Sequence, residues 1–163
     1  NAFMTRIESI KKKYKDKKIN FIERSIYTDK NCFALICKEN GSINEIEWKL
    51  YNNWFQWLND KFDVEPEGYI YIKTSPETCY GRIKKRNRTE ESNIPLDYLK
   101  NLNDKHEKWL INNENNNVPV LVLDGEEDFE NDEITFLKYL GKINEFYQNI
   151  KKSKFDKINF KNI

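Results

Sequence analysis

The sequence contains little of what marks a membrane, secreted or nucleic-acid-binding protein. No apolar run approaches the roughly 20 residues that a bilayer-spanning helix requires, and no signal peptide is visible. The three cysteines, Cys32, Cys37 and Cys79, are odd in number and lack the CxxC spacing of metal sites. A net charge of +1, from 28 basic and 27 acidic side chains, gives no reason to expect nucleic acid or a membrane as a partner. We therefore expect a cytoplasmic chain with reduced thiols, while a mitochondrial or nuclear location stays open.

Glycine is also scarce. None of the five glycines precedes Lys-Ser or Lys-Thr, so the phosphate-binding pattern GxxxxGK[ST] does not occur in these 163 residues. Aromatic residues, in contrast, make up 14% of the chain, and such a content argues against disorder. The length fits one folded domain of ordinary size.

Short apolar runs alternate with longer helical patterns along the chain. Strands are expected at 18–22, 69–74 and 118–123, and helices at 25–41, 43–61, 76–86, 96–111 and 128–146, with Asp128 capping or preceding the last helix. This alternation predicts an α/β fold with a parallel sheet sandwiched by helices. A doubly wound sheet usually has about five or six strands, so the fold is expected to lack its first strand.

The helix expected at 43–61 has two apolar faces. One face is a stripe of aliphatic residues and tryptophans, and the other is aromatic: Ile43, Ile46, Leu50, Trp54, Trp57 and Leu58, then Trp48, Tyr51 and Phe55. One helix face suffices for packing on a core, so the second face needs another partner.

Charged residues follow the first expected strand directly. Glu23 and Arg24 stand where the carboxyl end of a parallel strand would border a ligand crevice. A carboxylate there can bind Mg²⁺, and a guanidinium can hold a reacting phosphate oxygen. A structural ion pair at the strand end is an equally good interpretation of these two residues alone.

Three arginines fall within seven residues in the middle of the chain. Arg82 and Arg86 lie one helical turn apart, and Arg88 follows just beyond the helix. The fork geometry of guanidinium groups suits phosphoryl oxygens. Because Lys84 and Lys85 lie between the arginines, a solvated basic surface is the competing interpretation.

The residues that carry a family resemblance occur in order along the chain. They are the segments Glu23 to Asp29, Asn44 to Trp48 with Trp54 and Trp57, Tyr71 to Cys79, Arg82 to Glu91, Ile94 to Leu99, Lys105 to Leu110 and Glu127 to Phe129. In these segments the chain resembles the deoxynucleoside kinases of the deoxycytidine and deoxyguanosine kinase type. The resemblance covers residues 1–150, the C-terminal part of one kinase domain including an arginine lid, and leaves 151–163 as a basic, frayed tail.

The resemblance implies a P-loop NTPase-like fold and phosphorylation of a deoxyribonucleoside at its 5′-hydroxyl for nucleotide salvage, with ATP or another nucleoside triphosphate as donor and Mg²⁺. It implies that Glu23 associates with the metal and that Arg24 contacts the 5′-hydroxyl region and the transferred phosphate. Arg82, Arg86 and Arg88 match lid arginines that close over the donor phosphates.

Substrate recognition and assembly follow from the same resemblance. Glu91 matches the acid that binds the sugar 3′-hydroxyl, and Arg6 with Asp29 matches a pair that reads the edge of the base, which favours deoxycytidine or a purine deoxynucleoside. Asp128 and Phe129 match the loop around the donor adenine. The aromatic helix at 43–61 is similar to part of the helix pair through which these kinases form homodimers.

A kinase of this type also needs a P-loop and a general-base glutamate, and both would lie upstream of Asn1. We therefore expect the chain to be inactive alone and to belong to a longer protein. The alternative is a catalytically inactive scaffold, because the same family includes an accessory subunit of respiratory complex I. Thymidylate kinases share the fold and the lid, but their Asp-Arg-aromatic pattern differs from Glu23-Arg24-Ser25.

Overall fold

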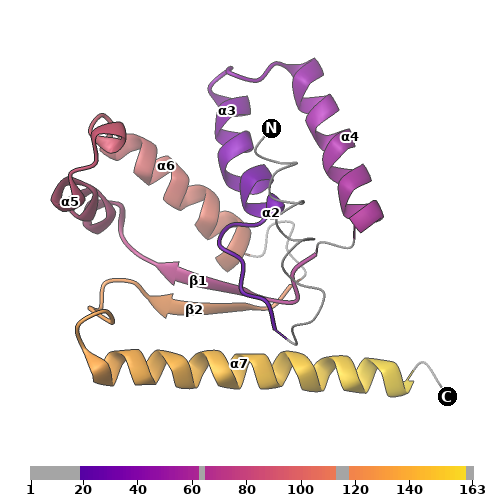
Figure 1. Cartoon of the computed structure of the whole chain (residues 1–163). Coiled ribbons are helices and arrows are strands. Elements are labelled where there is room, and N and C mark those ends of the chain that lie inside the picture. The colour runs from indigo at the N-terminus through magenta and orange to yellow at the C-terminus, as the bar shows by residue number, and fades with distance from the viewer. Residues whose placement is uncertain (1–18, 63–64, 113–117, 161–163) are drawn as a thin grey trace. The chain divides into compact units, whose positions relative to one another are not determined.

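The computed structural model describes the backbone of residues 19–62, 65–112 and 118–160, and side chains up to residue 153 (Figure 1). The chain divides into two compact units, Asn1–Pro66 and Glu67–Ile163. The first unit contains α2 (Ile26–Thr28), the π-helical η1 (Asp29–Ala34), α3 (Leu35–Glu39) and α4 (Glu45–Phe62). The second contains β1 (Tyr69–Lys73), α5 (Pro76–Arg86), the 3₁₀ helix η2 (Thr89–Glu91), α6 (Leu96–His106), the π-helical η3 (Glu107–Ile111), β2 (Val120–Asp124) and α7 (Glu133–Phe160).

The first unit is a helical hairpin. The helices α2, η1 and α3 run on from one another, in agreement with the helix expected at 25–41, and Gly41, with a φ of +79°, turns the chain toward α4. Asn44 caps α4, because its side-chain oxygen accepts the backbone N–H groups of Ile46 and Glu47 at 2.9 and 3.0 Å. The core of the unit is Ile26 packed with Phe55 and Leu58.

The prediction of a strand at 18–22 is wrong for residues 19–22, which are the part that the structure describes. Residues 19–22 are irregular, and Phe21 is 68% exposed. A short apolar run becomes a strand only when a neighbouring strand satisfies its backbone groups. The sheet of the described chain contains only β1 and β2, so this run has no ladder to join. Glu23 and Arg24 accordingly lie in a bend rather than at a strand end.

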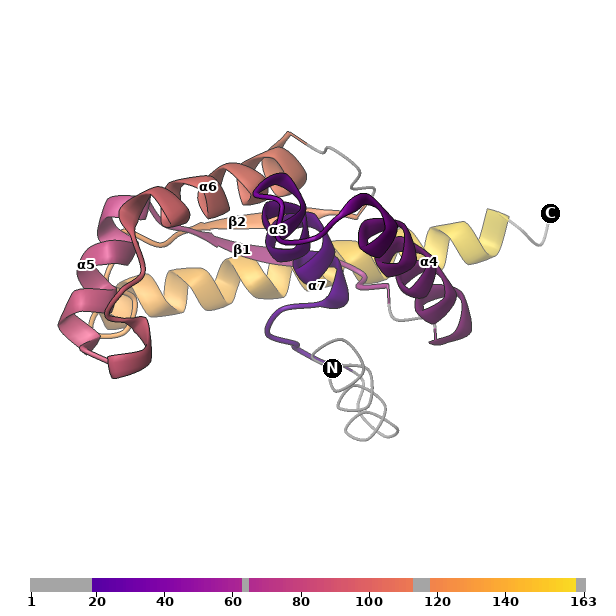
Figure 2. The ribbon, with the colours of Figure 1, turned by 90° about the horizontal axis from the view of Figure 1, so that it is seen from above.

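In the second unit, β1 and β2 form a parallel pair, in agreement with the expected sheet type. Tyr69 lies opposite Val120 and Lys73 opposite Asp124. The crossover between the strands contains α5, η2, α6 and η3, as parallel pairing requires. Figures 1 and 2 show α6 on one side of the two strands and α7 on the other.

Alternate residues of β1 contact the helices of the crossover. The Tyr69 ring packs edge-on against Trp109, with centroids 4.9 Å apart, and the Tyr71 ring stacks on His106. The Tyr71 hydroxyl donates to Glu107 Oε1 at 2.9 Å, and Lys73 Nζ lies 2.7 Å from Glu107 Oε2. These contacts hold the crossover against one face of the strand pair, and His106 is therefore a packing residue.

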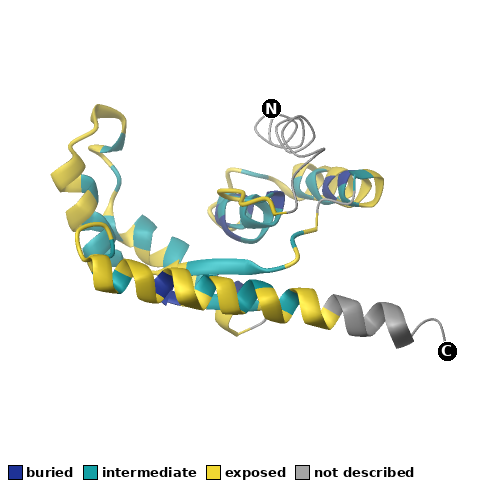
Figure 3. Ribbon diagram, turned by 60° about the horizontal axis from the view of Figure 1, so that its bottom comes forward, coloured by how far each residue is buried: buried dark blue, intermediate teal, exposed yellow. Residues whose placement is uncertain are grey.

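The ends of two helices decide where the loops of the second unit lie. Ser75 caps α5 with Pro76 in the first turn, and the helix spans Pro76–Arg86 as expected. The last helix begins later than expected, because Asp132, not Asp128, accepts the Ile134 N–H and the Thr135 hydroxyl, at 3.1 and 2.7 Å. It also continues to Phe160, so the expected basic tail is helical as far as Phe160. Figure 3 shows that exposed residues cover much of the outer side of α7.

Within the ranges that the structure describes, no helix has both the length and the apolar content needed to cross a membrane.

Candidate functional site: a strained arginine, an arginine lid and a carboxylate-rich loop

The bend at residues 23–25 presents Glu23 and Arg24 to solvent at the start of α2. Ser25 ends the bend by capping the helix: its hydroxyl accepts the Thr28 N–H at 3.3 Å, and Thr28 Oγ1 accepts the Ser25 N–H at 3.4 Å. The helix start therefore has a local cause in the sequence, and it fixes the position of the two charged residues before it.

Arg24 has a backbone conformation that arginine rarely adopts. Its φ is +57°, in the left-handed region, where a residue with a Cβ loses about 1 kcal/mol relative to glycine. Its guanidinium lies 4.9 Å from the centre of the Phe33 ring, in cation–π contact. Such backbone conformations persist only where the surrounding structure fixes them, and they occur often at functional positions.

Asp29 is the first residue of the π-helical segment η1, and its backbone N–H donates to Ser25 O at 3.2 Å. Single π-helical turns inside α-helices occur often at functional positions. Arg6, the residue expected to act with Asp29, lies outside the described residues.

Two of the three arginines expected to form a lid contact one carboxylate. Arg86 Nε and Nη2 lie 3.0 and 2.5 Å from Glu91 Oε2, and Arg88 Nη1 lies 3.8 Å from Glu91 Oε1. The chain reverses direction between them at Asn87, which caps α5 in the left-handed conformation with a φ of +51°. Arg86 and Arg88 therefore both contact Glu91, and Arg82 lies one turn earlier on α5.

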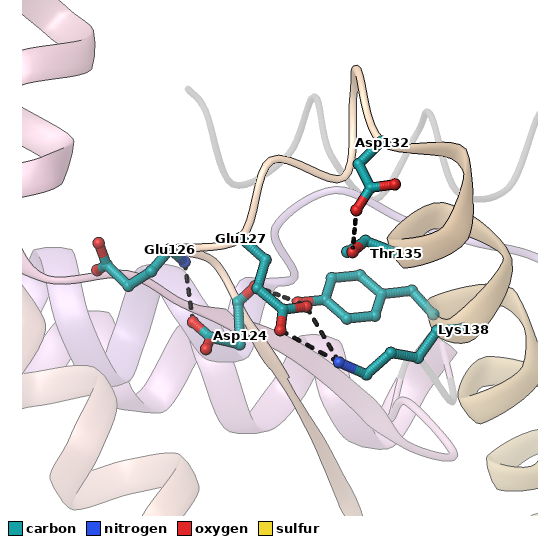
Figure 4. A network of polar contacts seen from close by, with 7 residues as sticks. Asp124, Glu126, Glu127, Asp132, Thr135 and Lys138 are labelled. Carbon is teal, nitrogen blue, oxygen red and sulfur yellow. Dashed lines mark hydrogen bonds and ion pairs between the residues drawn. The ribbon is translucent and has the colours of Figure 1, made fainter.

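The loop after β2 holds a second polar network, which the sequence reasoning recognised only at Asp128 and Phe129. Glu127 accepts the Tyr139 hydroxyl at 2.9 Å. It also forms an ion pair with Lys138 at 3.1 Å, which is drawn in Figure 4. The Tyr139 hydroxyl also contacts Asp124 O at 2.5 Å. The centres of the Phe129 and Tyr139 rings lie 5.7 Å apart.

Electrostatic effects in this loop follow from its hydrogen bonds. The Tyr139 hydroxyl bond holds the pKa of Glu127 below its ordinary value, and Asn131 does the same to the pKa of Asp128. Burial raises the pKa of Tyr139, and the neighbouring Glu127 carboxylate raises it further, to about 12. All three groups therefore keep one protonation state at neutral pH, with two carboxylates charged and the phenol neutral.

The chain is similar in sequence to known proteins. The family profile described as "Deoxynucleoside kinase" matches residues 1–150. The chain is 46% identical over 125 residues to "Deoxycytidine kinase 2" of Gallus gallus, covering 71% of this chain. The chain belongs to the deoxynucleoside kinase family. The family match includes both the bend at Arg24 and the lid.

Two further relatives extend the comparison of this deoxynucleoside kinase chain. "Deoxycytidine kinase" of Homo sapiens is 42% identical over 135 residues, 76% of this chain. "Probable deoxycytidine kinase FPV151" of Fowlpox virus (strain NVSL) is 40% identical over 149 residues, 90% of this chain. The matches span 47%, 52% and 63% of the chicken, human and viral proteins. The chain thus spans about half to two thirds of these relatives.

The expected site residues of this family member fall into the two units. Glu23, Arg24 and Asp29 belong to the first, and the lid with the loop of Asp128 and Phe129 belongs to the second. In the second unit the lid residues contact one another, whereas Asp128 binds Asn131 of its own loop, at 2.9 and 3.0 Å.

Sequence reasoning missed Glu126, Glu127 and Tyr139 in this kinase-family chain. The signal that could have found the first two is the run Gly125-Glu126-Glu127-Asp128 directly after an apolar strand, because side chains at the carboxyl ends of parallel strands gather at one edge. Tyr139 gives no such signal, since its hydroxyl reaches Glu127 only through the packing of α7 on β2.

Proposed function

We propose that the polypeptide containing this chain transfers a phosphoryl group from ATP, or another nucleoside triphosphate, to the 5′-hydroxyl of a deoxyribonucleoside in nucleotide salvage. The observation that carries the proposal is the family match over residues 1–150, which includes Glu23, Arg24 and all three lid arginines. The names of the relatives favour deoxycytidine as a substrate.

Arg24 and the lid would supply positive charge around the transferred phosphoryl group. Phosphoryl transfer depends on positioning and on charge stabilisation, and guanidinium groups match phosphate oxygens in geometry. The strained backbone at Arg24 supports a functional use of that side chain. The exposed ion pair of Arg86 with Glu91 stabilises the chain by at most about 1 kcal/mol. Bound substrates would therefore replace it at a small cost in free energy.

The chemistry of the residues fits a magnesium ion at Glu23. Mg²⁺ usually keeps several waters and takes one or two carboxylates together with the phosphates of the substrate. Among the residues that the structure describes, no group of three or more potential ligands converges, and Glu23 offers one exposed carboxylate. Glu23 would hold the ion, and the bound ion would neutralise charge on the donor phosphates.

The nucleoside would be recognised through both its sugar and its base. Glu91 would accept a hydrogen bond from the sugar 3′-hydroxyl, and Asp29 with Arg6 would read the base. A charged pair favours a base with both donor and acceptor groups, such as cytosine or a purine. Arg6→Met combined with Asp29→Ala would then shift preference toward thymidine.

The catalyst would be a polypeptide longer than these 163 residues. The GxxxxGK[ST] pattern that cradles donor phosphates is not among them, and we propose that this chain alone is inactive. A homodimer formed through α4 would complete the assembly, a proposal supported by the apolar side chains that α4 exposes.

The experiment is an assay of the native polypeptide with ATP, Mg²⁺ and each deoxyribonucleoside in turn. We expect the 5′-monophosphate of deoxycytidine or of a purine deoxyribonucleoside, identified by mass spectrometry, and no product after chelation of Mg²⁺. A native polypeptide that forms no monophosphate from any deoxyribonucleoside would contradict the proposal and favour a scaffold role.

A further inference from the structure

The side chain of Glu126 connects the loop after β2 to the first turn of α5. Its Oε1 accepts the backbone N–H of Ser75 at 2.5 Å, and its Oε2 accepts the hydroxyl of Thr78, also at 2.5 Å. Ser75 is the N-cap of α5, and Thr78 lies in the first turn. One carboxylate thus binds both ends of this turn across about fifty residues of sequence.

The two loops are also joined by their backbones. The Gly125 N–H donates to Lys73 O at 2.6 Å, and a side chain at Gly125 would collide with Thr74. The Glu126 N–H donates to Asp124 Oδ1 at 2.9 Å, a contact visible in Figure 4. Glu126 therefore projects from a loop whose geometry is fixed on the side of β1.

The same loop is fixed on the side of α7 by the next residue. Glu127 binds Tyr139 and Lys138, as described above. Glu126 therefore holds α5 to the short connection that follows β2, and Glu127 holds α7 to the same connection. Asp128 and Phe129 follow directly along the chain.

Electrostatics favours Glu126 at this position. The N-terminus of a helix carries partial positive charge and unsatisfied N–H groups. The hydrogen bond from Thr78, then those from Ser75, lower the pKa of Glu126, and Arg82 acts in the same direction. Because Glu126 is itself exposed to solvent, we expect its contacts to add little to the free energy of unfolding. Their main effect would be to fix the position of α5.

We propose that Glu126 is a positioning residue of the phosphoryl transfer: it fixes the first turn of α5 to the loop that carries Asp128 and Phe129, and so sets where the lid arginines stand. The proposal rests on the proposed kinase function. Arg82 lies one turn beyond the contact, and the rigid helix carries the placement on to Arg86. Small displacements of groups that act on a reacting phosphate cost about a hundredfold in rate.

The test is steady-state kinetics of the native polypeptide with Glu126→Ala, Glu126→Gln and Thr78→Val. We expect Glu126→Ala to lower kcat about tenfold or more and to raise the KM for ATP, with an unchanged KM for the nucleoside. Glu126→Gln keeps an acceptor oxygen and should recover part of the loss. Thr78→Val combined with Glu126→Ala should cost little more than Glu126→Ala alone, because Glu126→Ala already removes the contact with Thr78.

The matched control is Glu130→Gln, which removes one negative charge from an exposed position of the same connection. It should leave kcat and the KM for ATP unchanged. If Glu126→Ala matches the wild type in both constants, or if its loss vanishes once rates are divided by the folded fraction, the positioning role is wrong.

A second measurement needs no activity. Burial raises the pKa of the Cys79 thiol, Arg82 lowers it, and Glu126 raises it further. Glu126→Gln should therefore speed the alkylation of Cys79 at neutral pH, followed by peptide mass spectrometry, while Glu130→Gln should not. An inactive wild type would contradict the kinase proposal, and an unchanged Cys79 rate in Glu126→Gln would separately contradict the contact on which the positioning role depends.

Discussion

At the scale of single residues, Arg24 combines a proposed role in phosphoryl transfer with a backbone conformation that costs stability. Its left-handed backbone would suit glycine, yet the position holds a long cationic side chain over the Phe33 ring. Nothing in the sequence indicated this conformation, because φ at a bend depends on how the capped helix begins at Ser25. The residue type itself indicated phosphate chemistry.

The backbone at Arg24 makes a prediction about stability. Arg24→Gly and Arg24→Ala both lose the contact with Phe33, but only glycine adopts a positive φ without a Cβ clash. The glycine variant should therefore be more stable than the alanine variant by about 1 kcal/mol. Urea unfolding of the two variants measures the difference, and equal stabilities would mean that this backbone is not strained.

At the scale of elements, the connection from β2 to α7 combines a strand end, a carboxylate network and a helix cap. The sequence predicted β2 from the apolar run at 118–123, a strong local signal, but it placed the start of the following helix too early. It could not predict which carboxylate reaches which helix. That choice depends on the register of β1 with β2, which places Lys73 beside Asp124.

This connection also predicts a dependence of stability on pH. The pKa of Glu127 is lowered in the folded chain, first by the Tyr139 hydroxyl and then by Lys138. Its stabilising effect is therefore complete down to about pH 5 and is lost as the pH falls through the lowered pKa. Glu127→Gln should destabilise the chain at pH 7, and its difference from the wild type should shrink in acid. Unfolding curves at several pH values test this, and a difference that stays constant would contradict it.

At the scale of the whole molecule, α4 has one buried and one exposed apolar face. Phe55 and Leu58 are buried in the first unit, whereas the other face exposes Ile46, Leu50, Trp54 and Trp57. The sequence predicted two apolar faces, but it grouped Leu58 with the exposed stripe, whereas the structure buries Leu58 beside Phe55. An exposed stripe of this kind is typical of a surface that another protein molecule covers.

The exposed face of α4 predicts a homodimer. Leu50→Glu places a charge in the middle of this face and should shift the native polypeptide from dimer to monomer in sedimentation velocity. Gln56→Glu adds the same charge at an exposed position of α4 off this face, and it should leave the dimer intact. A wild type that is monomeric at all concentrations, or a Leu50→Glu variant that stays dimeric, would contradict the assignment.

The sequence predicted most helices and the parallel strand pair, because caps, prolines and helical periodicity are local signals. The error at residues 18–22 has a nonlocal cause, since a strand depends on its neighbours. The three arginines could be singled out from their spacing, and the contact of Arg86 and Arg88 with Glu91 is local, because these residues lie within six positions. The Glu126 and Tyr139 contacts could not, since they join segments far apart in sequence.

The most direct test of the account is the rate of deoxycytidine phosphorylation by the native polypeptide and its Arg24→Gly variant, at saturating ATP, Mg²⁺ and nucleoside. The glycine variant lacks the guanidinium, and glycine adopts the positive φ at this position without strain. A loss of activity therefore cannot come from backbone strain. The account predicts that the wild type forms the 5′-monophosphate and that the variant, fully folded, loses at least about a hundredfold in kcat. An unchanged kcat in the variant, or no product from the wild type, would contradict it.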